Sequence, residues 1–121
     1  MCKANKNFRF CHERWCFMPV MIGTVATFPH PKADKSQVLK IAEEEHEVFS
    51  AWENLCKKST GEKFCDGECQ HAPYCSLVGS LVDECADLIT ATCNLLAALG
   101  VDDLRPAMAA CEHRNRERGR L

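Results

Sequence analysis

Apolar residues recur at helical spacing in two long stretches of the chain. From Val38 they follow one another at steps of three and four residues, and the pattern stops at Gly61. A second stripe, made mainly of leucines, ends before Gly100, a residue suited to the position just after a helix. The pattern predicts helices over about 35–58 and 76–99.

Acidic residues mark where helices should begin. Asp34 precedes the first stripe and is followed three residues later by Gln37, which is a variant of the capping box. Asp102 or Asp103 can cap a third helix, expected to run to about residue 118. Because aromatic residues make up only 7% of the chain, a fold of many short strands is disfavoured, and an all-α fold is predicted.

The chain is expected to divide into an extension and one domain. Residues 1–33 are predicted to be a poorly structured N-terminal extension, and residues 34–121 an all-α domain with a Cys-rich insert at 59–75. The apolar run at 15–28 also resembles a secretory signal. Because proline and glycine interrupt that run, and because 10 cysteines suit a reducing compartment, a cytoplasmic location is preferred.

Size and charge narrow the classes of function. A chain of 121 residues can bury a core without disulfides or metal, but it is too short for a second full domain. With 15 Lys+Arg against 17 Asp+Glu, the net charge is −2, which argues against nucleic-acid and membrane-surface binding. No stretch approaches the roughly 20 apolar residues of a membrane-spanning helix. The expected partners are a small substrate and further copies of the chain.

Three cysteines and a histidine crowd the insert between the first two predicted helices. Soft thiolates and an imidazole this close in sequence can surround one tetrahedral metal ion. The spacing is not that of a standard CxxC pair, so a loop disulfide and free thiols stay open as alternatives. The possible structural zinc ligands are Cys65, Cys69, His71 and Cys75.

Four acidic residues interrupt the apolar stripes of the two long helices. Glu44 and Glu47 lie one turn apart on the core-facing side of the first helix, and Glu84 and Asp87 repeat the arrangement on the second. Carboxylates that converge between helices repel one another unless a cation compensates them. Oxygen ligands without a matching set of histidines suit Mg²⁺ or Mn²⁺. The alternative is an acidic surface paired with Lys40 and solvent.

These motifs resemble those of a known group of enzymes. The first is Glu43-Glu44-Glu45-His46-Glu47, and the second is Glu84-Cys85-Ala86-Asp87. They are similar to the EExxE and ExxD signatures of the all-α NTP pyrophosphohydrolases of the MazG-like and dimeric dUTPase superfamily. The segments 99–103 and 113–120 also resemble the last helix of that family, and the resemblance covers about residues 35–120. It implies a MazG-like helical bundle.

The resemblance also implies roles for individual residues. It makes Glu43 the catalytic, water-orienting candidate and Lys40, Asn115 and Arg118 the substrate-binding candidates. The implied reaction is Mg²⁺-dependent hydrolysis of a nucleoside triphosphate to the monophosphate and pyrophosphate, for house-cleaning or nucleotide-pool control. The implied Mg²⁺ ligands are Glu44, Glu47, Glu84 and Asp87.

The sequence also predicts that the chain assembles with further copies of itself. Two helices with one acidic seam and a third over them do not close a core, so a homodimer or a dimer of dimers is predicted.

Two other functions are alternatives to the pyrophosphohydrolase. One is a non-enzymatic helical module that binds zinc through its Cys loop. The other, which is disfavoured, is a di-iron bundle built on the ExxH pair Glu43 and His46.

Overall fold

The computed structural model describes residues 19–61 and 76–121 of the chain, and within these ranges it contains three helices and no strand. The prediction of an all-α fold is confirmed. The first two helices begin where the apolar stripes predict, and their far ends differ from the prediction by only a few residues. The helices are α1 (Lys35–Gly61), α2 (Ser76–Ala98) and α3 (Arg105–Glu117).

Asp34 caps the start of α1, as the sequence indicates. Its Oδ1 accepts a hydrogen bond from the Ser36 backbone N–H at 2.9 Å and a second, short one from the Ser36 hydroxyl. The Asp34 N–H donates to the carbonyl of Lys32 at 3.0 Å, rather than to the side chain three residues later that a full capping box would use. Only half of the predicted capping box is therefore formed. The Asp34 side chain caps the helix, but the Asp34 N–H does not bond to the side chain of Gln37.

Gly100 ends α2 in a left-handed conformation with φ of +85°. The N–H of Val101 donates to the carbonyl of Leu96 at 2.9 Å, and that of Gly100 donates to Ala97 at 3.0 Å, which together make a Schellman motif. The chain then reaches α3, where the side chain of Asp103 accepts the Arg105 N–H at 3.0 Å, although the residue at the N-cap position is Leu104. Asp103, one of the two predicted capping acids, therefore caps α3 from the residue before the N-cap position.

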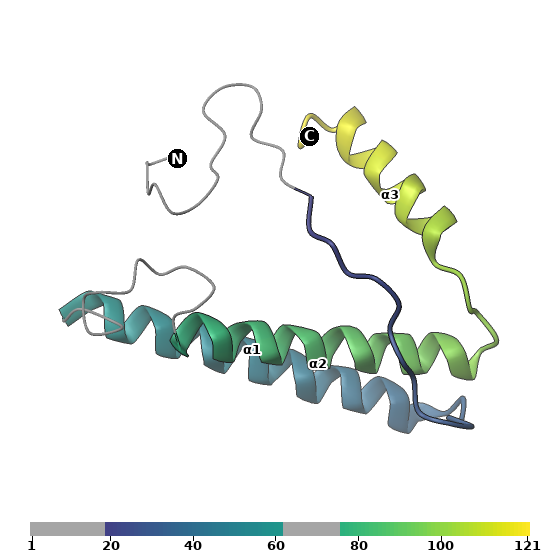
Figure 1. The fold of residues 1–121 in the computed structure, drawn as a ribbon, viewed down its shortest axis with the longest axis horizontal. Helices are drawn as coiled ribbons and strands as arrows, with labels where there is room; N and C mark the ends of the chain where they lie inside the picture. The colour runs from purple at the N-terminus through teal and green to yellow at the C-terminus, as the bar shows by residue number, and fades with distance from the viewer. Residues whose placement is uncertain (1–18, 62–75) are drawn as a thin grey trace.

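The helices α1 and α2 run antiparallel and side by side, whereas α3 turns away from them (Figure 1). Small side chains allow the close approach of the pair, since the apolar residues buried within the described ranges are Ala51 and Ala91. Among the described helices, α3 packs on neither of the other two. Within residues 19–61 and 76–121, the helices that pack on each other are therefore α1 and α2, and their packing positions the acidic residues.

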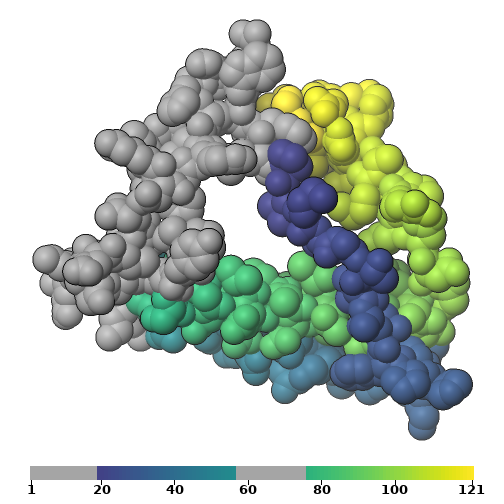
Figure 2. All heavy atoms as spheres, viewed as in Figure 1, coloured from purple at the N-terminus to yellow at the C-terminus, as the bar shows by residue number. Residues whose placement is uncertain are grey.

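Large apolar side chains stay exposed on all three helices of the single chain. Val38, Phe49 and Trp52 share one flank of α1, because spacings of eleven and three residues return to the same side of a helix. In the space-filling view, α3 is connected to α2 by the joining segment and is otherwise separated from it (Figure 2). No helix in the described ranges has the length and continuous apolar character needed to cross a bilayer. On α2 and α3 the exposed apolar residues include Val82, Ile89 and Met108.

The segment that precedes α1 is tied to α2 by a buried amide. Residues 19–33 contain no helix or strand. The backbone N–H of Phe28 donates to Oδ1 of Asn94 at 2.8 Å, and Asn94 is only 5% exposed. The first 18 residues of the predicted extension lie outside the described residues.

Candidate metal centre

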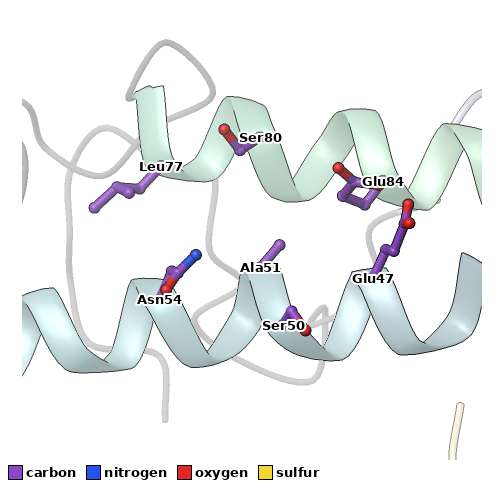
Figure 3. A pocket seen from close by; sticks show the side chains of 7 residues that line it. All are labelled: Glu47, Ser50, Ala51, Asn54, Leu77, Ser80 and Glu84. Atoms are coloured by element: carbon purple, nitrogen blue, oxygen red, sulfur yellow. The ribbon is translucent and has the colours of Figure 1, made fainter.

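Three carboxylates converge between α1 and α2. Glu44 and Glu47 come from successive turns of α1, and Glu84 faces them from α2. Each offers one oxygen, and these three oxygens all lie within 4.8 Å of one another. The close-up shows Glu47 pointing across the gap toward Glu84 (Figure 3). The antiparallel packing of the two helices therefore brings together acids that are about forty residues apart in the sequence.

Two oxygens of this cluster are buried without a partner. Glu44 is 5% exposed, and its Oε1 accepts no hydrogen bond; Oε1 of the half-buried Glu84 is in the same state. A buried carboxylate oxygen without a donor costs free energy, because it has lost its hydration and gained nothing in return. A divalent cation bound by these oxygens would restore the lost interaction. The donor set, which is entirely carboxylate, fits Mg²⁺ or Mn²⁺.

Repulsion between the carboxylates of the cluster also shifts the pKa of one of them. The negative charge of Glu44 raises the pKa of Glu47 above its ordinary value of 4.5, and burial and the neighbouring Glu84 raise it further. Glu47 therefore takes up a proton at a higher pH than an unperturbed glutamate, because the neighbouring acids repel its ionised form.

Lys40 supplies part of the missing positive charge. Its Nζ lies 3.1 Å from Oε2 of Glu44 and 3.1 Å from Oε1 of Glu43, one turn further along α1. Hydrogen bonds to Glu44 and then to Glu43 raise the pKa of Lys40, so the ammonium stays charged. Lys40 reaches only the outer oxygen of Glu44, and Oε1 stays without a donor.

The remaining acids of the predicted site lie outside the cluster. Glu43 is exposed and pairs with Lys40. Asp87, one turn beyond Glu84 on α2, is exposed, and the three-carboxylate group does not include it. The structure thus brings together three of the four predicted metal ligands.

The predicted substrate-binding residues of α3 do not reach the cluster within one chain. Asn115 interacts locally, with its Nδ2 3.7 Å from the Cys111 thiol and its Oδ1 3.4 Å from Arg120. Arg118 is the C-cap residue of α3, which packs on neither α1 nor α2. The possible zinc ligands Cys65, Cys69, His71 and Cys75 lie outside the described residues.

A groove adjoins the acidic cluster, and no motif in the sequence predicts it. The groove holds about 310 Å³ and opens between the C-terminal half of α1 and the first turns of α2 (Figure 3). The sequence does contain one indication of the groove. Ser50 and Asn54 follow Glu47 by three and seven residues, and Ser80 precedes Glu84 by four, so these polar residues share a helix face with the acids. Seven residues line it: Glu47, Ser50, Ala51, Asn54, Leu77, Ser80 and Glu84.

Comparison of the chain with protein-family models, with curated proteins and with solved structures gives no significant match.

Proposed function

We propose that the protein is a Mg²⁺-dependent nucleoside triphosphate pyrophosphohydrolase that converts a (deoxy)nucleoside triphosphate to the monophosphate and pyrophosphate. The observation that carries the proposal is the buried carboxylate of Glu44, which has one unpartnered oxygen and lies against Glu47 and Glu84. The resemblance of the EExxE and ExxD motifs to those of the MazG-like enzymes points to the same chemistry. Its purpose would be house-cleaning or nucleotide-pool control.

The residues of the α1/α2 pair divide the work of such a reaction. Glu44, Glu47 and Glu84 would hold the ion, and Asp87 would join them from the next turn of α2. Glu43 is placed on the exposed side of α1, where its carboxylate can accept a proton from the attacking water. When bound, Mg²⁺ supplies charge neutralisation of the triphosphate and a lowered pKa of the attacking water.

Lys40 contributes a second positive charge beside the phosphates. Its ammonium is held by Glu43 and Glu44 and is half-exposed, so it can contact a phosphate oxygen without leaving α1. Water would add to the α-phosphorus and give its proton to Glu43, and the bond from that phosphorus to the oxygen bridging to the β-phosphorus would break. Lys40 would place a positive charge near the pyrophosphate that leaves with this oxygen.

A second copy of the chain would complete the site and the core. The exposed apolar flank of α1, around Phe49 and Trp52, lacks a cover within the described residues, and α3 packs on neither helix. A homodimer or a dimer of dimers would cover this flank and allow Asn115 and Arg118 of one subunit to reach the phosphates held by another.

A cytoplasmic location also belongs to the proposal. Three half-buried cysteines on the described helices, Cys85, Cys93 and Cys111, carry no disulfide. Half-buried reduced thiols act as small apolar groups in a helical core and persist in a reducing compartment.

The test is pyrophosphate release from a panel of NTPs, dNTPs and dUTP, measured with Mg²⁺, with Mn²⁺ and with EDTA. We expect release that requires the metal and is lost in Glu84→Ala. The matched control is Asp83→Ala, which removes an exposed acid next to Glu84 that is not part of the cluster and should leave the rate unchanged. Absence of release from every nucleotide, or full activity of Glu84→Ala, would contradict the proposal.

A further inference from the structure

We infer that the groove beside the acidic cluster binds the uncharged nucleoside half of the substrate, with Asn54 as its main specificity-determining residue. This inference rests on the proposed function, because it assigns an orientation to the nucleotide at the same site. The observation behind it is a change in chemistry along the seam between α1 and α2.

The charged groups and the neutral groups of the seam are separated along α1. Lys40, Glu44 and Glu47 occupy three successive turns toward the N-terminal end. Beyond Glu47 the side chains that face the groove are uncharged, up to Asn54 about 10 Å further along the helix axis. A nucleotide has the same division, because its phosphates are charged and its sugar and base are not. The phosphates therefore belong at the acidic cluster with its cations, and the nucleoside belongs in the groove.

The lining of the groove fits a nucleoside in its hydrogen-bonding capacity. The Asn54 amide points from α1 toward the space between the helices and carries both donors and an acceptor (Figure 3). Ser50 and Ser80 add hydroxyl groups, which donate and accept in the same way. An amide that pairs with the edge of a base discriminates between bases, and hydroxyls suit the oxygens of a sugar.

The shape of the groove fits the same ligand. Buried Ala51 forms a small floor, and Leu77 supplies an apolar surface against which the face of a planar base can lie. At about 310 Å³ the groove is at the small end of ligand pockets, which suits one nucleoside rather than a longer oligonucleotide. A larger side chain in place of Ala51 would fill this space.

The test measures binding, so that it does not depend on turnover. The common ribo- and deoxyribonucleoside 5′-monophosphates, and inorganic pyrophosphate as the ligand without a nucleoside, are titrated into the full chain with Mg²⁺ by calorimetry. We expect Asn54→Leu to weaken binding of the preferred monophosphate roughly tenfold, since a hydrogen-bonding group of the base is left unpaired. Binding of pyrophosphate should stay unchanged.

The matched control is Glu53→Leu, which places the same side chain on the neighbouring exposed position of α1, outside the groove. It should bind the monophosphates as the unmodified chain does. Asn54 is itself exposed, so its replacement leaves the α1/α2 packing intact, and Ser80→Ala provides a second variant on the opposite helix.

The outcomes separate this inference from the proposed function. If the chain binds no monophosphate, or if Asn54→Leu and Ser80→Ala both bind as well as Glu53→Leu, the groove assignment is wrong even where pyrophosphate release is observed. Equal weakening of monophosphate and pyrophosphate binding would also overturn it. Selective weakening of the monophosphate supports the groove assignment, and a lack of hydrolysis would then contradict only the proposed enzymatic function.

Discussion

The α1/α2 pair and α3 are equally well formed as helices, yet among the described helices only α1 and α2 pack on each other. Each helix has local signals at its ends, such as the Asp34 cap of α1 and a second Schellman motif at Gly119 after α3. The pair buries Ala51, Ala91 and the carboxylate of Glu44, whereas α3 buries no residue. Local sequence is thus sufficient to specify a helix, but a chemical site needs the packing of one helix on another.

The charged residues of the two regions also differ, because the acidic cluster of the pair faces inward and the charged residues of α3 face outward. In the pair, acids face inward and exceed the positive charge supplied by Lys40. On α3 the charged side chains are exposed, and Arg116 pairs with Glu112 within the helix at 2.8 Å; Nε2 of His113 also lies 3.1 Å from Glu117. Under the proposed function, the pair would bind the cation, and the arginines of α3 would suit the phosphates held by that cation.

The largest effect is expected for Glu44→Gln. This change keeps the shape of the side chain and removes one of the charges that hold the metal, so hydrolysis should fall by about a thousandfold or more. The metal-free protein should retain its helices, since the substitution also removes repulsion from Glu47. Pyrophosphate release and circular dichroism measure the two quantities. Substantial turnover by a folded Glu44→Gln protein would exclude the cluster as the metal centre.

A second prediction concerns where α3 acts. Arg118→Ala should raise KM roughly tenfold or more, because a bidentate contact to phosphate is lost. If Arg118 serves the site of another subunit in a dimer, unfolding and refolding Arg118→Ala together with Glu84→Ala should restore about a quarter of full activity at substrate concentrations well below KM. Half of the dimers are then mixed, and each mixed dimer has one intact site of its two. Each variant refolded alone is the control. Lack of recovery would place Arg118 at the site of its own chain.

The exposed flank of α1 should be the surface that recruits the second copy. Trp52→Glu puts a charge on this flank, so we expect the assembly to dissociate and the activity to fall about tenfold. The control is Glu53→Gln, which changes a neighbouring exposed position without adding charge to the flank. Light scattering after gel filtration reports the mass. An unchanged oligomer, or a monomeric protein before mutation, would refute this role.

The sequence predicts the helices well because periodicity and caps are local properties. Asp34 and Gly100 mark their ends through contacts within a few residues. The meeting of Glu44 with Glu84 also follows from the sequence, since each acid interrupts an apolar stripe that has to be packed. What the sequence does not reveal depends on tertiary structure. The exposure of Asp87 follows from how α2 lies on α1, and the groove is lined by serine and asparagine, which are common on any helix surface.

A smaller effect is expected from pH. The charge of Glu44 raises the pKa of Glu47, so Glu47 in the metal-free protein contributes stability that is present below its ordinary pKa of 4.5 and lost as the pH rises through its higher folded value. Metal binding needs the ionised form, so the affinity for Mg²⁺ should be lower at pH 5 than at pH 8. Calorimetric titration at the two pH values measures it. A Glu47→Gln protein with the same pH dependence would assign the effect to another group.

The smallest effect is expected at the cap of α1, which lies in the packed pair but far from its chemistry. Hydrogen bonds from the Ser36 hydroxyl and backbone lower the pKa of Asp34, so this residue stabilises the fold above its ordinary pKa of 3.8 and loses that contribution as the pH falls through its lower folded value. At pH 7, Asp34→Ala should lower Tm by roughly 5 °C and leave kcat unchanged, because only the first turn of α1 is affected. Asp34→Ser should restore most of the loss, since serine also caps. If Asp34→Ala instead abolished turnover at unchanged Tm, the first turn of α1 would belong to the site, and the separation of capping from chemistry in the pair would be wrong.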